Sequence, residues 1–415
     1  MLSEKSIAYN KKTVLIYLLA VMFLFFSMKF FEKNQMMTGA CSSAYLSGAA
    51  NWSAGESWKV NYAEMDLFEA LEDEQRVAYR FQREDNTVEY AHNAIGLLHI
   101  NALSRSIFFW QGDLQSIISL QQLTHLFLSL LILFLLKSQY HRGLFYFLYV
   151  VNPIILYFVD FPYYYFWQVI PAALWIIYLL NDKLIKEGIY LVSILFAFIF
   201  IVRPSTLFLL LAVLGYIGYK EGKVRAVLSI LLFFAVMFMI KPESKGAIAS
   251  GPWHTIYVGI GAYENKYNIN MEDNDGYKIF ELETGKKYVA GCRENENIGL
   301  YLTLLKEKYV HIAKESPLLL AKNALLNILQ SYGIGYKVNV MSINYASSFL
   351  GLILILFLIY FREYFLFFII GFSSIAFTPY FPPIGAYMFG SYILIAYAWL
   401  VVGTKLLNKT RKGEV

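Results

Sequence analysis

The sequence predicts an all-α membrane protein of about ten transmembrane helices, with both termini in the cytoplasm and two large external loops that carry interfacial helices. Three observations lead to this fold class. The 415 residues are 58% hydrophobic and only 16% charged, and the mean hydropathy is +0.48. The apolar residues form long runs, and lysine and arginine recur in every second connection between those runs.

Ten apolar segments are close to the length that a spanning helix requires. A hydrocarbon layer about 30 Å thick takes roughly 17 to 25 residues of α-helix. The first segment is followed by Glu32-Lys33 and not by a small-residue cleavage site, so we expect a span rather than a removable signal peptide. The ten segments are 13–31, 116–136, 143–159, 163–180, 188–202, 205–219, 226–240, 345–361, 364–380 and 385–404.

The orientation follows from the positive charges, because short loops that hold lysine or arginine stay on the cytoplasmic side. The short loops of the other set, around Asp160, Arg203 and Pro382, hold only one such residue, Arg203. The basic set contains Lys5, Lys11, Lys12, Lys137, Arg142, Lys183, Lys186, Lys220, Lys223, Arg225, Arg362, Lys405, Lys409, Arg411 and Lys412. Both termini are therefore expected in the cytoplasm.

This topology divides the chain into five parts. They are the N-terminus with the first span (1–31), an acid-rich external loop one (32–115), a six-span block (116–240), external loop two (241–344), and a three-span block with a basic tail (345–415). The formal net charge of +5 arises from the cytoplasmic loops, so we infer a lipid bilayer as partner and no nucleic acid.

Both external loops contain stretches that we expect to be helical. In loop one, the acidic stretch 64–89 indicates one or two surface helices, and the mixed apolar and polar stretch 91–110 suits a helix at the membrane interface. In loop two, helices are expected over 296–314 and 316–330. The second begins with Ser-Pro and has an apolar face, so we interpret it as interfacial.

The two cysteines of the chain, Cys41 and Cys292, both fall in the external loops, where oxidation can occur. A disulfide between them would join the loops. Two unrelated free thiols are the alternative, because the sequence does not give their separation.

Two groups of side chains could bind a sugar phosphate. In loop two, Trp253, His254 and Tyr257 could cover the apolar face of a sugar, with Glu264 and Asn265 bonding to its hydroxyls. His254 could equally be a packed structural residue.

The second group is cationic. Arg203, at the edge of a span, could bind phosphate, snorkel to the interface or pair with Asp160. Lys241, at another external helix end, is a second phosphate candidate. Asp273 and Asp275 are compatible with a divalent metal and equally with an exposed turn, so no metal ligand or cofactor is assigned.

This arrangement resembles the GT-C superfamily of membrane glycosyltransferases, which take sugars from polyprenyl-phosphate carriers. The resemblance rests on the long acidic first loop, the short middle connections, the late second loop, Asn152-Pro153 leading to Asp160, and Arg203-Pro204 at a helix end. It implies a polyprenyl-linked sugar donor and a glycan or lipid acceptor. It also implies a first-loop carboxylate as base, cationic side chains that hold the carrier phosphate, and a role in surface-polysaccharide synthesis such as O-antigen assembly.

One stretch departs from the family pattern. Such enzymes place an acid shortly after the first span, whereas Gly39 to Tyr45 contains Cys and Ser and no acid. A base must lie within hydrogen-bond reach of the acceptor hydroxyl, so we look later in loop one. The candidates are Glu64, Asp66, Glu84 and Asp85.

Three other functions are compatible with the sequence. A repeat-unit polymerase of O-antigen or capsule would need a basic second loop, and loop two has nearly equal numbers of acids and bases. A transporter or flippase would place ionisable groups near mid-membrane, where the spans are mostly apolar. A non-enzymatic scaffold is the third. The composition is typical of a bacterial inner-membrane protein, with the predicted site facing the exterior.

Overall fold

The structure is a computed structural model, and it describes residues 19–29, 41–53, 59–82, 87–89, 96–240, 252–288, 296–338 and 340–411. Helices account for nearly all of the regular structure in these ranges. The strands among them are two short ones, β1 (Lys59–Val60) and β2 (Val88–Glu89), which pair antiparallel with Val60 opposite Val88. The predicted all-α class is therefore confirmed.

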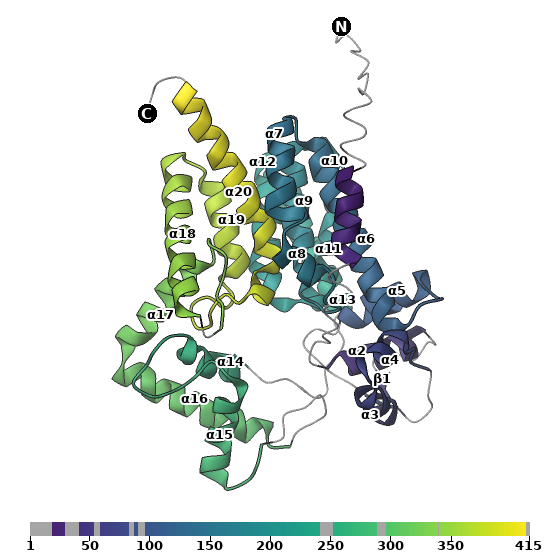
Figure 1. Cartoon of the computed structure of the whole chain (residues 1–415), viewed down its shortest axis with the longest axis vertical. Coiled ribbons are helices and arrows are strands. Elements are labelled where there is room, and N and C mark those ends of the chain that lie inside the picture. Colours follow the sequence, from purple (N-terminus) through teal and green to yellow (C-terminus); the bar gives the residue numbers. More distant parts are fainter. Residues whose placement is uncertain are drawn as a thin grey trace.

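A bundle of apolar helices forms the upper part of the molecule in Figure 1. Each of the ten predicted apolar segments contains a helix of this bundle. The elements of the bundle are a first helix, Leu19–Lys29, then α6 (Asp113–Leu135), α7 (Gln139–Phe145), η1 (Tyr146–Val150), α8 (Pro153–Val159), η2 (Phe166–Gln168), α9 (Val169–Leu180), α10 (Lys183–Lys186), α11 (Ile189–Val202), η3 (Pro204–Thr206), α12 (Leu207–Glu221), α13 (Lys223–Ile240), α18 (Met341–Tyr360), α19 (Tyr364–Ser374) and α20 (Gly385–Arg411).

Several of these helices are long and apolar enough to cross a membrane. Four qualify alone, namely α6, α13, α18 and α20, and α7 with η1 and α8 would make a fifth span that is bent by 57°. The bend falls at Asn152-Pro153, because proline has no N–H to continue the helical ladder. The helices in the remaining segments are shorter, so the number of ten spans and their orientation stay predictions.

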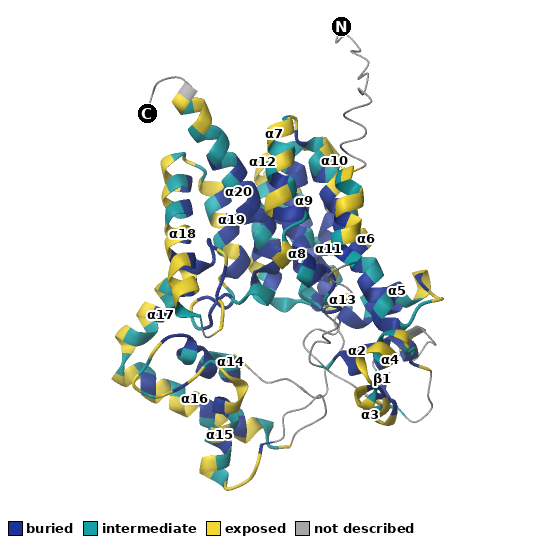
Figure 2. Cartoon of the chain, in the orientation of Figure 1, coloured by how far each residue is buried: buried dark blue, intermediate teal, exposed yellow. Residues whose placement is uncertain are grey.

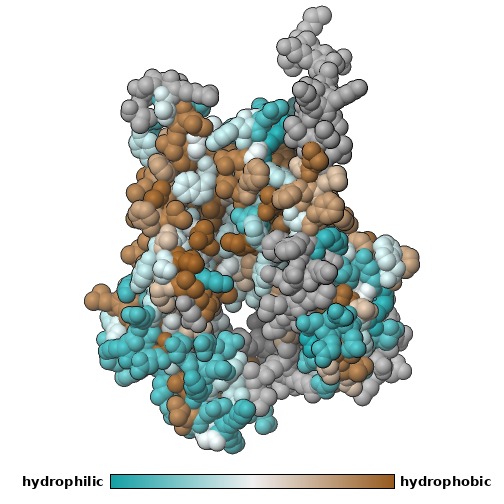
Figure 3. Space-filling model, in the orientation of Figure 1, coloured by the Kyte–Doolittle hydropathy of each residue, from teal (hydrophilic) through white to brown (hydrophobic). Residues whose placement is uncertain are grey.

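Two polar lobes lie together at one end of the bundle, opposite α7 and α10 (Figure 1). In Figure 3 their surface is mainly hydrophilic, whereas the bundle is mainly hydrophobic. Lobe one consists of α2 (Ser42–Ser53), β1, α3 (Tyr62–Ala70), α4 (Asp73–Ala78), β2 and α5 (Gly96–Ile107). Lobe two consists of α14 (Pro252–Val258), η4 (Gly259–Ala262), α15 (Asp273–Thr284), α16 (Ile298–Glu315) and α17 (Pro317–Gln330).

The bundle and lobe two each have buried side chains in their interior (Figure 2). The largest core cluster runs through the bundle, around side chains such as Trp175, Phe196 and Phe389. Lobe two has its own aromatic core, which includes Phe280 and Tyr301. Helix α2 is buried along most of its length and its Tyr45 belongs to the bundle's core, so α2 connects lobe one to the bundle.

Helix α17 has its polar side chains inside and its apolar side chains outside. Asn323, Asn327 and Gln330 are buried, at spacings that put them on one face of the helix. Leu318 and Leu325 are 83% and 59% exposed. This pattern is the reverse of that of a helix surrounded by water, and it suits the interfacial position expected for residues 316–330.

Candidate functional site

The strongest candidate is Arg203, at the turn between α11 and α12. Helix α11 ends there because Arg203 has an extended backbone and the following Pro204 cannot donate to the helical ladder. A 3-10 turn follows, in which the backbone N–H and hydroxyl of Thr206 donate to the Arg203 carbonyl at 3.0 and 2.7 Å. The turn therefore holds the arginine backbone in a defined position.

Three tyrosines surround the Arg203 guanidinium. Its central carbon lies 4.6 Å from the ring centroid of Tyr164, 5.5 Å from that of Tyr165 and 4.8 Å from that of Tyr387. We name these four residues the arginine–tyrosine cluster. Tyrosine faces attract a cation without neutralising it. No ion pair within the described ranges involves Arg203, and its Nε is buried without a hydrogen-bond partner there. Among the described residues, the positive charge of Arg203 therefore has no anionic partner.

The arginine–tyrosine cluster lies where lobe one meets the bundle. The ring of Tyr45, on α2, is 6.2 Å from that of Tyr163, which is 3.9 Å from that of Tyr164. On the neighbouring helix α5, Gly96 lies against the backbone of Ile201 and Val202, directly before the arginine. Two helices of lobe one therefore pack against residues that adjoin the cluster.

Lobe two reaches the same cluster from another direction. The Tyr387 ring lies 5.3 Å from Phe377 and 5.4 Å from Phe381. Both phenylalanines belong to the hydrophobic core of lobe two, together with Tyr257 and Phe280. The uncompensated charge is therefore placed between the two lobes, at their junction with the apolar bundle.

Asp160 is the expected alternative partner of Arg203. It is buried at the C-terminal end of α8, and its Oδ1 accepts from Nε2 of Gln122 at 2.8 Å. No ion pair joins Asp160 to Arg203. The other cationic candidate, Lys241, lies outside the described residues.

The predicted carboxylates of loop one have different environments. Glu64 is buried on α3, and its Oε1 accepts from the backbone N–H of Gln82 at 2.6 Å. Asp66 is exposed. Glu64 and Asp66 are two residues apart on a helix, so their side chains point to opposite faces and do not act as a pair. Glu84 and Asp85 lie outside the described residues.

The structure brings a further carboxylate, Glu69, to the stretch that lacks an acid in the sequence. The hydroxyl of Ser43, at the start of α2, donates to Glu69 Oε1 at 2.6 Å. Sequence reasoning did not single out Glu69, because the contact joins residues 26 positions apart. Glu69 lies on α3 and is exposed, so its carboxylate is accessible.

The expected sugar platform of loop two lies on α14. His254 and Tyr257 are buried, and Trp253 is half-buried with its ring 6.1 Å from that of Tyr309. Burial raises the pKa of Tyr257 to about 12, so its hydroxyl stays protonated at neutral pH. Trp253 is thus the most accessible ring of the three.

His254 is held from both sides of its ring. Its Nδ1 shares a hydrogen bond with the hydroxyl of Tyr301, and its Nε2 lies 3.1 Å from Oδ1 of Asp273. A carboxylate can only accept, so neutral His254 carries its proton on Nε2. This hydrogen bond holds the pKa of Asp273 below its usual value. The buried position of His254 fits the structural alternative considered for this residue.

The two remaining polar candidates of loop two also differ. Glu264 is exposed. The Asn265 amide closes its own loop: its nitrogen donates to the carbonyls of Tyr263 and Ile269 at 3.1 and 2.9 Å, and its oxygen accepts from the backbone N–H groups of Tyr267 and Ile269. Asn265 therefore has its hydrogen bonds satisfied within the loop.

Asp273 and Asp275 have different partners: the first contacts His254, and the second contacts Asn270 and Lys278. Asp275 is buried, accepts from the backbone and side-chain nitrogens of Asn270, and pairs with Lys278 at 2.7 Å. Within the described ranges, no group of three or more His, Cys, Asp or Glu side chains is arranged to hold a metal ion.

Cys41 directly precedes the buried helix α2 and has a positive φ of 63°. It is disulfide-bonded. Cys292, its expected partner, lies outside the described residues. The pairing of these two cysteines stays a prediction.

Comparison with known proteins finds no matching family model, and neither a curated protein nor a solved structure matches the chain.

Proposed function

We propose that the chain is a membrane glycosyltransferase. It would move a sugar from a polyprenyl-phosphate carrier to a glycan or lipid-linked acceptor, on the side of the membrane where the two lobes lie. In a bacterial inner membrane with cytoplasmic termini, this side is the exterior. The proposal combines the resemblance to the GT-C superfamily with the arginine–tyrosine cluster.

The uncompensated charge of Arg203 is the observation that carries the proposal. A guanidinium taken out of water without an anionic partner is costly in free energy, so such a position is retained where an anion binds. A phosphate accepts two parallel hydrogen bonds from a guanidinium. The hydroxyls of Tyr164, Tyr165 and Tyr387 could donate to its remaining oxygens. The position at the lobe end of the bundle suits a phosphate whose polyprenyl chain stays in the bilayer.

The reaction would be a direct displacement at the anomeric carbon of the donor sugar. The acceptor oxygen forms a bond to that carbon while its proton passes to a carboxylate. The bond from the carbon to the carrier phosphate breaks, and the departing oxygen keeps the electron pair. Arg203 would stabilise the negative charge that the phosphate gains.

Lobe one supplies the candidate base. Among its described carboxylates, Asp66 and Glu69 are exposed on α3, whereas Glu64 is buried and accepts a backbone hydrogen bond. Glu69 is the better placed of the two, because its partner Ser43 lies on α2, whose Tyr45 packs against Tyr163, the ring next to Tyr164 of the cluster. Trp253 of lobe two could cover the apolar face of a sugar.

The test replaces Arg203 in the host. A strain without the gene is complemented with wild type, Arg203→Ala or Arg203→Lys, and the surface glycan is resolved by size on a gel and analysed for sugars. We expect Arg203→Ala to fail to restore the glycan. Arg203→Lys should restore it in part, because lysine keeps the charge and loses the planar fork.

Arg225→Ala is the matched control. Arg225 is half-exposed and pairs with Glu221 at the other end of the bundle, so this variant should restore the glycan fully. If deletion of the gene leaves the size ladder of the surface glycan intact but removes one sugar from its composition, the result supports the transferase. If the glycan of the deletion strain contains only a single repeat unit, the protein is a polymerase and not a single-sugar transferase. Full restoration by Arg203→Ala at normal expression would overturn the assigned phosphate site.

A further inference from the structure

The C-terminal half of α5 and the turn that follows it present four large apolar side chains to the outside. Leu103, Ile107, Phe109 and Trp110 are 54%, 44%, 69% and 65% exposed. The rings of Phe109 and Trp110 pack edge to face, 5.0 Å apart. We name these four residues the aromatic hook. An exposed apolar group of this kind marks a surface that another apolar phase covers.

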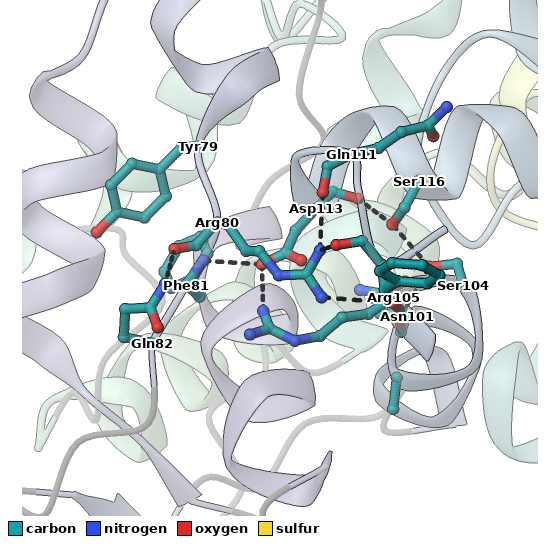
Figure 4. A network of polar contacts seen from close by, with 12 residues as sticks. Tyr79, Arg80, Phe81, Gln82, Asn101, Ser104, Arg105, Gln111, Asp113 and Ser116 are labelled. Carbon is teal, nitrogen blue, oxygen red and sulfur yellow. Dashed lines mark hydrogen bonds and ion pairs between the residues drawn. The ribbon is translucent and has the colours of Figure 1, made fainter. Parts of the chain in front are cut away.

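A network of polar contacts holds the turn that carries the aromatic hook (Figure 4). Arg105 donates to the buried carboxylate of Asp113 at 2.6 Å, and the backbone N–H of Phe81 donates to the same oxygen at 2.8 Å. Arg80 donates to the carbonyls of Phe109 and Gln111. The network thus holds the backbone of the turn on both sides of Trp110.

The backbone of the turn also packs closely against helix α4. A Cβ at Gly112 would lie 2.1 Å from the carbonyl oxygen of Val77 and 2.7 Å from the carbonyl carbon of Ala78. These are backbone atoms of α4, which cannot move aside as a flexible side chain can. Glycine at this position therefore lets the turn rest directly on α4.

The neighbouring elements indicate what covers the hook. Helix α6 begins three residues after Trp110 and is long and apolar enough to span a membrane. Its exposed side chains Leu123, Phe127, Leu130 and Phe134 recur every three or four residues, which forms one lipid-facing stripe. The hook is continuous in sequence with the start of this span, at the depth where tryptophan is enriched in membrane proteins.

Helix α17 provides a second, independent indication of the same depth. It lies on the opposite side of the molecule from α5, at the same end of the bundle (Figure 1). Its outward Leu318 and Leu325 and its inward Asn323 and Asn327 fit an apolar phase outside the helix. The aromatic hook and the outward face of α17 lie at a similar level of the bundle (Figure 1), as a planar lipid surface requires.

We propose that the aromatic hook inserts into the boundary between headgroups and acyl chains, in the leaflet on the side of the two lobes. The partner is the lipid surface itself. Through the Arg105–Asp113 pair, the inserted rings fix the height of lobe one above the membrane, and with it the height of α2. This anchoring does not depend on the proposed glycosyltransferase activity.

The test measures tryptophan quenching by brominated phosphatidylcholine, with the full chain reconstituted in vesicles. Bromines are placed either just below the headgroup or near the end of the acyl chains. Wild type is compared with Trp110→Phe, which keeps an aromatic ring at the tip, and with Trp52→Phe as control, because Trp52 is also exposed in lobe one and packs on His99.

We expect Trp110→Phe to lose a component of the emission that shallow bromines quench more than deep ones, while Trp52→Phe keeps that component. Quenching of Trp110 by aqueous iodide and not by bromolipid would place the hook in water and overturn the proposal. Protection of Trp110 from both quenchers would indicate a second copy of the chain or another protein on the hook, which also overturns it. Gel filtration of each variant verifies that the fold is kept.

Discussion

Two arginines in this molecule show how the same side chain can have opposite roles. Arg105 is buried against Asp113, and its charge is compensated within the protein. Arg203 is surrounded by tyrosine rings and has no anionic partner among the described residues. The first arrangement stabilises a turn, whereas the second leaves a charge available for a ligand. The difference lies in the side chains that surround each guanidinium.

The buried pair gives a prediction for stability. Arg105→Ala leaves the Asp113 carboxylate buried without its cation, which typically costs about 3 to 5 kcal/mol. We therefore expect a clearly lower midpoint of thermal unfolding in detergent, followed by fluorescence-detected gel filtration. Arg76→Ala is the control, because the Arg76–Asp73 pair is more exposed and should contribute about 0 to 1 kcal/mol. Equal midpoints for the two variants would refute a stabilising role of the Arg105–Asp113 pair.

At the scale of the elements, α5 and α11 are in close contact directly before Arg203. A Cβ at Gly96 would lie 2.6 Å from the backbone nitrogen of Val202 and 2.7 Å from the carbonyl carbon of Ile201. Backbone cannot yield as a flexible side chain does, so an alanine here must push the two helices apart. This contact between lobe one and the bundle thus requires a glycine at position 96.

This contact gives a prediction for function. Gly96→Ala should lower both the unfolding midpoint and the restoration of the surface glycan, because it displaces α5 from the turn that holds Arg203. Gly215→Ala, in α12, is the matched control: nothing lies within 4 Å of a Cβ there, and alanine is the better helix former by about 1 kcal/mol. If Gly96→Ala behaves like Gly215→Ala in both measurements, the close packing has no functional role.

At the scale of the whole molecule, the lobes lie at the end of the bundle opposite α7 and α10 (Figure 1). The distribution of lysine and arginine predicts that the lobe end faces the exterior. A membrane-impermeant maleimide should therefore label Leu282→Cys, at the exposed end of α15, in intact cells. Lys223→Cys, at the start of α13, should react only after the cells are opened. The reverse result would show that the lobes face the cytoplasm.

Much of the architecture could be predicted from the chain alone. Apolar runs of spanning length predicted the helical bundle, since their lengths depend only on bilayer thickness and the rise of a helix. The helices expected over 296–314 and 316–330 correspond to α16 and α17. The bend between α7 and α8 was not predicted, although Pro153 marks its position.

Local pattern determined which segments are apolar, helical or basic in this protein, because these properties belong to a few consecutive residues. The partners of each charge were decided only by the tertiary structure. Arg203 was singled out from its place at a helix end, yet its tyrosine neighbours come from segments as distant as Tyr164 and Tyr387. Glu69 beside Ser43 was not foreseen at all. Electrostatic interactions depend on distance in space, and that distance appears only when the lobes pack onto the bundle.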